Sequence, residues 1–376
     1  MKYDVAVIGL GGMGSAVAAH LARRGLRVAG FEQFTLVHDL GSSAGRTRII
    51  RKAYFEDPAY VPLLERAYAL WRELEDETLT ALLDLFGVLM IGQPDAASIR
   101  GVARAAAAFD IPIEHLDAAQ VRARFPLLRP LDGEVAILEP YAGVVFPERA
   151  IAAHLRMARK YGAELHERTW VRSFEPSDGG VRLVFEGGES VEAAHVAVCA
   201  GPWTSDLLGQ LGATLTVQRN VQYWFAPRSE PCGPDRVPAF FLERADLLAP
   251  VYGIPDLGDG LKIAFHGHGE SSHADRLDRD VHESEIGAMR TTLAKWIPDA
   301  GGELCSVKAC MYTMTPDAHF AIGRVPGFAN IVVACGFSGH GFKFAPAIGE
   351  IVAQTIADGA PKLDARFLAL ERFTGR

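Results

Sequence analysis

The sequence is poor in cysteine and in the patterns that cysteine forms. Only five of its 376 residues are Cys, and none belongs to a C-x-x-C pair. Neither a zinc ribbon nor a thioredoxin-like redox motif is therefore indicated, and no other set of metal ligands is visible, so we expect no metal site. An odd number of cysteines without a regular spacing is typical of a reducing compartment, which predicts a cytoplasmic protein.

The sequence also lacks long apolar runs and an excess of positive charge. No apolar stretch approaches the roughly 20 residues that cross a bilayer, and the first residues carry no signal-peptide pattern. The formal net charge is -8, whereas binding to nucleic acid or to an anionic membrane needs a basic face. We therefore expect no association with a membrane or with nucleic acid.

The start of the chain has the pattern of a complete β-α-β unit. Residues 4–8 are a β-branched apolar run that predicts a buried parallel strand. Residues 15–24 have apolar positions at helical spacing, and residues 26–31 predict the next strand.

Glycines at the first turn of this unit match a dinucleotide-binding motif. Gly9, Gly11 and Gly14 form G-x-G-x-x-G between the strand and the helix. The first permits a tight turn, the second lets the backbone approach a pyrophosphate, and the third packs the helix on the strand. Glu32 ends the second strand, where a carboxylate accepts hydrogen bonds from a ribose and disfavours the 2′-phosphate of NADP. The motif alone leaves FAD and NAD open.

A chain of this length is expected to form two domains. Short strands and Ala-rich helical pieces fill 79–143, and many strand-like segments fill 214–315, which suits a large sheet outside the nucleotide domain. The nucleotide domain is then assembled from 1–78, 144–213 and 316–376, with the other domain inserted twice.

Three further segments are distinctive. They read GSSAGRTRIIR at 41–51, KACMYTMTPD at 308–317 and GFSGHGFK at 336–343. Together with the glycine-rich turn they resemble the monomeric sarcosine oxidase family, which includes N-methyltryptophan oxidase and pipecolate oxidase. The resemblance implies an α/β fold, in which a glutathione-reductase-like, FAD-binding Rossmann domain carries an inserted α+β substrate domain on a large mixed sheet. It also implies a monomer.

The resemblance implies a covalent FAD. In the family, the cysteine at the position of Cys310 forms a thioether with the flavin 8α-methyl carbon, although an isolated cysteine is more often a buried core residue. Arg48 matches a position near the flavin ring, where positive charge stabilises the reduced, anionic flavin. Further cofactor contacts are implied at Ser42, Ser43, Val171, Gly201, Gly339, Gly341 and Lys343.

The resemblance also implies a site for an anionic substrate. Arg51 and Lys343 match a pair that binds the substrate carboxylate, for which arginine offers a planar fork of donors. Lys262 matches a lysine that activates O2 through a water, although a lysine between apolar strand residues more often has no such role. The remaining implied pocket residues are Tyr252, His266 and Tyr312.

The implied reaction is oxidation of a secondary amino acid to an imine, which water hydrolyses, with reduced flavin reoxidised by O2 to give H2O2. Sarcosine, other N-substituted glycines and cyclic imino acids are candidate substrates. Ala44 replaces a histidine that is common in the family, so the space there and the basic loop around it suit a larger or dianionic substrate. The alternatives are an amine dehydrogenase with another electron acceptor, an NAD-dependent dehydrogenase, and a flavoprotein that binds without turnover.

Overall fold

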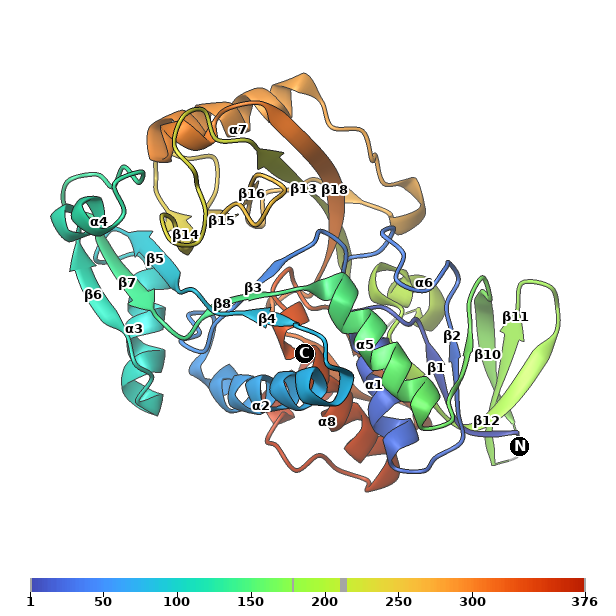
Figure 1. Cartoon of the computed structure of the whole chain (residues 1–376). Helices are drawn as coiled ribbons and strands as arrows, with labels where there is room; N and C mark the ends of the chain where they lie inside the picture. Colours follow the sequence, from blue (N-terminus) through green and yellow to red (C-terminus); the bar gives the residue numbers. More distant parts are fainter. Residues whose placement is uncertain (1, 178, 210–214, 375–376) are drawn as a thin grey trace.

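The fold consists of three β-sheets with helices packed around them (Figure 1). It is described by a computed structural model that covers residues 2–177, 179–209 and 215–374. Within these ranges, no helix is both long enough and apolar enough to cross a membrane.

The first sheet has a parallel centre built from distant parts of the chain. Its strands are β1 (Tyr3–Ile8), β2 (Val28–Phe31), β9 (Glu164–His166), β10 (Val171–Ser177), β11 (Gly180–Phe185), β12 (Ser190–Val198), β19 (Ala321–Val325) and β20 (Phe328–Cys335). β1 lies between β12 and β2, and these pair outward with β20 and β9, all in parallel. β10, β11 and β12 form an antiparallel meander. This arrangement confirms the predicted β-α-β unit and the Rossmann-type domain.

Four helices pack together beside this sheet, in the lower part of Figure 1. They are α1 (Gly12–Arg23), α2 (Val61–Thr78), α5 (Pro147–Lys160) and α8 (Ala345–Ala357). α1 contacts both α5 and α8, and α2 contacts α5 and α8. Their apolar faces and the sheet share one buried cluster, which packs α1 and the glycine-rich turn at its start against the sheet.

The second sheet is large and mixed. Its strands are β5 (Val88–Gly92), β6 (Glu114–Asp117), β7 (Val135–Glu139), β13 (Thr216–Phe225), β14 (Ala239–Glu243), β15 (Val251–Ile254), β16 (Leu261–Phe265), β17 (Ser271–Ser272) and β18 (Leu304–Met314). β14 and β5 pair in parallel, and the other pairs are antiparallel. The predicted large mixed sheet is confirmed.

One helix in this region was not predicted. We expected strands through 214–315, but α7 (Glu283–Trp296) lies within it. Its buried residues Ile286, Met289, Leu293 and Trp296 recur every three or four positions and join a cluster with the second sheet. The helical spacing was present, but strand-like segments on both sides obscured it. The remaining helices are α3 (Ala97–Phe109), α4 (Ala118–Arg124), α6 (Thr204–Leu208) and α9 (Glu371–Thr374).

A small third sheet lies where the chain passes between the two large ones. It contains β3 (Arg48–Ile50), β4 (Leu83–Asp84) and β8 (Gly143–Val145). The two large sheets fall in the ranges on which the domain division was drawn, but that division stays a prediction. Its boundaries at 1, 213, 214 and 376 lie outside the described residues.

Candidate active site

A cavity of about 490 Å³ lies between the two large sheets. One wall is formed by the ends of β1, β2 and β12 and by the start of α1. The opposite wall comes from β5, β14, β15 and β18, and loops 41–43 and 336–341 close the sides. The cavity is therefore bounded by segments from all parts of the chain.

The glycine-rich turn lies at the cavity, and it has no room for a side chain at Gly9 or Gly14. Gly9 has φ +84°, and a Cβ there would lie 2.5 Å from the carbonyl oxygen of Cys199. A Cβ on Gly14 would lie 1.7 Å from the carbonyl oxygen of Gly9. Gly9 and Gly11 line the cavity, whereas Gly14 lies behind them and packs α1 against the strand. This is the geometry that the motif predicts.

Glu32 lies at the end of β2, as predicted, and lines the cavity. Its carboxylate accepts hydrogen bonds from the backbone N–H groups of Leu10 (2.9 Å) and Phe34 (3.1 Å) and lies 3.4 Å from His38 Nε2. Burial alone would raise the pKa of Glu32, but these neighbours outweigh it and lower the pKa. The carboxylate is therefore ionised and held facing the cavity.

The loop that carries Arg48 folds back on its own side chain. The guanidinium donates hydrogen bonds to the carbonyl oxygens of Ser42 (3.1 Å), Ala44 (2.5 Å) and Thr47 (2.9 Å). Ser42, Ser43 and Arg48 all line the cavity. Arg48 thus positions the loop while also facing the cavity.

Cys310 is buried on β18 beside this loop. Its Sγ lies 3.7 Å from the carbonyl oxygen of Ser42 and 3.9 Å from Arg48 Nη2. Cys310 is not among the lining residues, but its neighbours Met311 and Tyr312 are. The sulfur is therefore one layer behind the cavity surface.

The lining fits a dinucleotide cofactor. Ser42 Oγ and Thr313 Oγ1 are buried without a hydrogen-bond partner among the described residues, and both residues line the cavity. Buried hydroxyls normally have partners, so a bound ligand would supply them here. The other predicted cofactor contacts also line the cavity, namely Val171, Gly201, Gly339, Gly341 and Lys343.

Two cations and one carboxylate lie together in the cavity. Arg51 forms an ion pair of 2.8 Å with Glu56 and donates to the carbonyl oxygen of Ala53 (2.7 Å). Lys343 Nζ donates to the carbonyl oxygen of His340 at 2.8 Å. Arg51, Glu56 and Lys343 all line the cavity, so the predicted pair of cations is brought together with an acidic neighbour that was not predicted.

Burial shifts the pKa values of these groups. Burial lowers the pKa of Lys343 to about 7, and the positive charge of Arg51 contributes to this shift. Burial opposes ionisation of Glu56, but Arg51 and the other nearby positive groups lower its pKa to about 2. Glu56 neutralises one positive charge. An anion bound in the cavity would favour the protonated, positively charged form of Lys343.

The rest of this end of the cavity is aromatic and apolar. His266 packs against Phe241 and Tyr312, with ring centroids 5.7 and 5.8 Å apart, and against Tyr252. Burial lowers the pKa of His266 to about 4, so the imidazole is neutral at pH 7. The predicted residues Tyr252, His266 and Tyr312 all line the cavity. The apolar lining residues at this end are Ile49, Phe55, Val88, Met90, Phe241, Met311 and Phe337.

Lys262 is buried behind the loop of Arg48. Its Nζ donates to the carbonyl oxygens of Gly45 (2.7 Å) and Thr47 (2.8 Å), and it does not line the cavity. Burial holds the pKa of Lys262 well below 10.5, and the positive charge of Arg48 contributes to this shift. The predicted role in O2 activation would have to act from this position, one layer from the cavity surface.

Two charged residues of the basic loop also lie away from the cavity. The guanidinium of Arg46 lies 3.4 Å from Asp259 and against Trp224. Lys52 lies over the ring of Tyr68. Neither lines the cavity, so among the charged residues of 46–52 only Arg48 and Arg51 place positive charge there.

At the outer rim, the ligand atoms of Asp206, His273 and Asp275 lie within 4.8 Å of one another. All three are exposed, and Asp275 already accepts a hydrogen bond from Trp203. No other feature of the described residues points to a bound ion.

Sequence reasoning missed three polar residues that shape the site. Glu56 pairs with Arg51, Tyr54 lies under both cations, and His38 contacts Glu32. Glu56 stands five positions after Arg51 and next to Asp57, where an acidic residue is normally solvated. The aromatic pair Tyr54 and Phe55 beside it was the available signal that this segment is buried.

Comparison with known proteins identifies relatives along the whole chain. Residues 4–355 match the family model described as FAD dependent oxidoreductase. The chain is 46% identical over 363 residues to a monomeric sarcosine oxidase of Streptomyces avermitilis, covering 95% of this chain and 94% of the relative. It is 33% identical over 375 residues to an N-methyl-L-tryptophan oxidase of Yersinia pestis, covering 99% and 100%.

Solved structures show the same fold. L-proline dehydrogenase from P. horikoshii has a TM-score of 0.85 and 24% identity, covering 99% of this chain and 98% of that one. NikD, an unusual amino acid oxidase essential for nikkomycin biosynthesis, has a TM-score of 0.84 and 24% identity, covering 98% and 97%.

Proposed function

Since the chain belongs to the FAD dependent oxidoreductase family, we propose that it uses FAD to oxidise the C–N bond of an N-substituted amino acid. Membership of this family favours FAD over NAD as the dinucleotide bound at the dinucleotide-type wall, which is the wall formed by β1, β2, β12 and the start of α1. The named relatives act on sarcosine and on N-methyl-L-tryptophan, so a carboxylated secondary amine is the expected substrate.

The observation that carries this proposal is the group of Arg51, Lys343 and Glu56 inside the cavity. Glu56 balances one of the two cations, which leaves a single positive charge for one substrate carboxylate. A desolvated guanidinium and ammonium bind a carboxylate more strongly than exposed ones do. A carboxylate bound here would direct the amine toward the dinucleotide-type wall.

In the reaction we propose, bound flavin supplies the two-electron acceptor. Arg51 and Lys343 bind the carboxylate, and the aromatic side chains of Tyr252, His266 and Phe241 exclude water and orient the amine. His266 is neutral and therefore adds no positive charge that would oppose an amine. The neutral amine loses two electrons and two protons, one proton from carbon and one from nitrogen, as its C–N bond becomes an imine. Water then hydrolyses the imine.

The apolar wall formed by β5 and β14 disfavours substrates that carry a second charged group. Val88 and Met90 project from β5, and Phe241 lies beside Met90 in the neighbouring strand. A second carboxylate would have to lie against this wall without a cation. We propose a monocarboxylate with an apolar N- or α-substituent, in place of the dianionic substrate that the basic loop had favoured.

Anaerobic flavin reduction tests the proposed reaction. Sarcosine, N-methyl-L-leucine, L-proline and iminodiacetate should be added to the yellow holoprotein in the absence of O2. We expect bleaching by at least one monocarboxylate and slower bleaching by iminodiacetate. Flavin that none of these acids reduces would contradict the proposal and favour binding without turnover.

We further propose that Cys310 bonds covalently to the flavin, as the resemblance implies. Its sulfur lies 3.7 Å from the backbone of the cavity-lining residue Ser42, which supports attachment from behind the lining. After acid precipitation, yellow colour should stay with the protein but pass to the supernatant in Cys310→Ser. Cys305→Ser, at an exposed cysteine, is the matched control. Flavin released by acid from the unaltered protein would contradict the linkage.

The final electron acceptor is proposed to be O2, with H2O2 as the product, and Lys262 to assist its reduction. The alternative is a dehydrogenase that reduces another carrier. Equal reoxidation of the reduced protein in air and under argon would favour the alternative. We also propose a monomer in the cytoplasm, for which sedimentation velocity tests the oligomeric state.

A further inference from the structure

The ring of Tyr54 lies against both proposed carboxylate-binding cations. The guanidinium carbon of Arg51 is 4.5 Å from its centroid and Lys343 Nζ is 5.1 Å from it. Tyr54 is fully buried, so its ring cannot move without moving its neighbours. The position of this one side chain therefore influences where both cations lie.

A chain of hydrogen bonds links Lys343 to Tyr54 and to His340. Lys343 Nζ lies 2.8 Å from the carbonyl oxygen of His340 and 3.5 Å from the Tyr54 hydroxyl. The Tyr54 hydroxyl lies 2.6 Å from His340 Nδ1 and 3.3 Å from the carbonyl oxygen of His340. The other ring nitrogen of His340, Nε2, lies 3.0 Å from the carbonyl oxygen of Ala318.

These partners determine the direction of every hydrogen bond. A carbonyl oxygen only accepts, so Nε2 of His340 carries the proton and donates to Ala318. Burial lowers the pKa of His340 to about 4, so the ring is neutral and has a single N–H. Nδ1 therefore accepts, and the Tyr54 hydroxyl donates to it, because this contact is shorter than the one to the carbonyl oxygen of His340. The phenol oxygen is left with its lone pairs toward the ammonium of Lys343.

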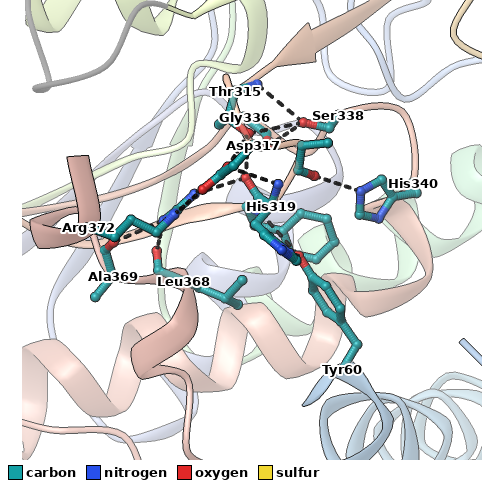
Figure 2. Close-up of polar contacts among 12 residues, drawn as sticks. Tyr60, Thr315, Asp317, His319, Gly336, Ser338, His340, Leu368, Ala369 and Arg372 are labelled. Carbon is teal, nitrogen blue, oxygen red and sulfur yellow. Dashed lines mark hydrogen bonds and ion pairs between the residues drawn. The ribbon is translucent and has the colours of Figure 1, made fainter. Parts of the chain in front are cut away.

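Ala318, whose carbonyl accepts the hydrogen bond from His340, lies in the loop of residues 315–319, and this loop is anchored to the C-terminal segment. In Figure 2, His340 lies on one side of residues 315–319 and Arg372 on the other. Arg372 forms a 2.7 Å ion pair with Asp317 and donates to the carbonyl oxygen of His319. The backbone N–H of Thr315 donates to Ser338 Oγ, which joins this loop to the one that carries His340 and Lys343. The hydrogen bond to Ala318 therefore fixes His340 relative to residues 315–319, which Arg372 in turn anchors.

We propose that Tyr54 and His340 are positioning residues for Lys343. The imidazole orients the phenol proton away from Lys343, so the phenol oxygen and the His340 carbonyl hold two of its three N–H groups. Within the described part of the chain this leaves the third N–H for a ligand in the cavity. The inference rests on the proposed function, in which Lys343 binds the substrate carboxylate.

Three variants of the holoenzyme separate positioning from simple anchoring of the loop. Tyr54→Phe keeps the ring and removes the hydroxyl. In His340→Asn, the amide oxygen takes the place of Nδ1 and still accepts from Tyr54, but the side chain no longer reaches Ala318. In His340→Gln, the amide N–H reaches Ala318, but Tyr54 is left with only the more distant backbone carbonyl of residue 340 as an acceptor.

The readout is discrimination between a carboxylate and its neutral analogue. The acid of the substrate panel that reduces the flavin fastest is compared with its own primary amide by anaerobic stopped flow. For each variant, the limiting reduction rate is divided by Kd, and the value for the acid is divided by the value for the amide. This acid-to-amide ratio should fall about tenfold in Tyr54→Phe and His340→Gln, as expected for a lost hydrogen bond to a charged group. It should stay within about threefold of wild type in His340→Asn, with flavin content and the limiting reduction rate of the acid unchanged in all three.

Two results would overturn the inference. One is an unchanged ratio in Tyr54→Phe and His340→Gln. The other is the reverse ranking, with His340→Gln intact and His340→Asn impaired, because that would make His340 an anchor of the loop alone. Should either His340 variant lose its flavin, Tyr54→Phe decides. Failure of the proposed function differs from both results, since the wild-type flavin would then not be reduced by any acid.

Discussion

The two walls of the cavity use different parts of the polypeptide. The wall beside β1 includes a stretch of bare backbone, with Gly9 and Gly11 at the surface and the N-terminus of α1 behind them. The opposite end is made of side chains such as Arg51, Lys343 and Phe241, which come from segments far apart in the sequence. A backbone wall tolerates few changes, whereas a side-chain wall changes with each substitution. A family can therefore keep one cofactor while its substrates diverge.

The largest expected effect comes from adding one carbon to the backbone wall. Gly14→Ala would place a Cβ 1.7 Å from the carbonyl oxygen of Gly9, a contact that only a backbone shift can relieve. We expect loss of FAD binding and of activity, measured by the ratio of visible to ultraviolet absorbance. Gly287→Ala is the control, because Gly287 also lies within a helix, α7, but a Cβ there meets nothing within 4 Å. Flavin retained in Gly14→Ala would show that this wall is more adaptable than its geometry implies.

The second prediction concerns Lys262, which lies behind the side-chain wall. Lys262→Met should slow reoxidation by O2 about a hundredfold or more, the typical cost of losing one group that stabilises developing negative charge. Anaerobic reduction by substrate should change little, because Lys262 does not line the cavity. Stopped-flow measurement of the two half-reactions tests this directly. A loss confined to the reductive half-reaction would assign Lys262 a structural role in holding the carbonyl groups of Gly45 and Thr47.

The third prediction removes a cation from the side-chain wall and leaves the backbone wall intact. Arg51→Gln leaves Glu56 without its ion-pair partner, and loss of one member of a buried charge pair costs about 2 to 5 kcal/mol. We expect kcat/KM to fall about a hundredfold with FAD still bound. Lys52→Gln, one residue further on and outside the cavity, should stay within about twofold. Equal losses in both variants would point to general damage of the loop.

The smallest effect is a pH dependence. Lys343, with a pKa of about 7, loses its proton as the pH rises through 7, while Glu56, with a pKa of about 2, stays ionised. His340 and His266, with pKa values of about 4, stay neutral, and Arg51 stays charged. A carboxylate binds the charged lysine, so binding is strong below pH 7 and weakens above it. The Kd of propionate, which has no amine, should rise about tenfold between pH 6 and pH 8. A flat profile would exclude Lys343 as a carboxylate ligand.

The same contrast explains which parts could be predicted from sequence. Gly9, Gly14 and Glu32 lie where the motif predicts, because the spacing of a strand, a turn and a helix is a local property of the chain. Glu56 was missed because its burial depends on Arg51 and on strands far away in sequence.

Lys262 shows the limit of a resemblance. The resemblance implies a lysine that activates O2, but not that its ammonium donates to two loop carbonyls. The environment of that side chain is set by the loop at 45–47, more than 200 positions away in the sequence. The helix α7 was missed for a related reason, since its buried face is defined by the sheet it covers.

The order of strands in the first sheet has a consequence for biosynthesis. β1 pairs with β12 through Tyr3 and Ala193, and β12 pairs with β20 through Val196 and Ile331. At about 5 to 20 residues per second, a ribosome needs roughly 15 to 65 seconds to reach Ile331. Until then residues 196–198 of β12 have an unpaired edge, which is open to misassembly with other chains. We expect newly made chains to depend on chaperones until the last strand emerges, and the cofactor to enter only after translation is nearly complete.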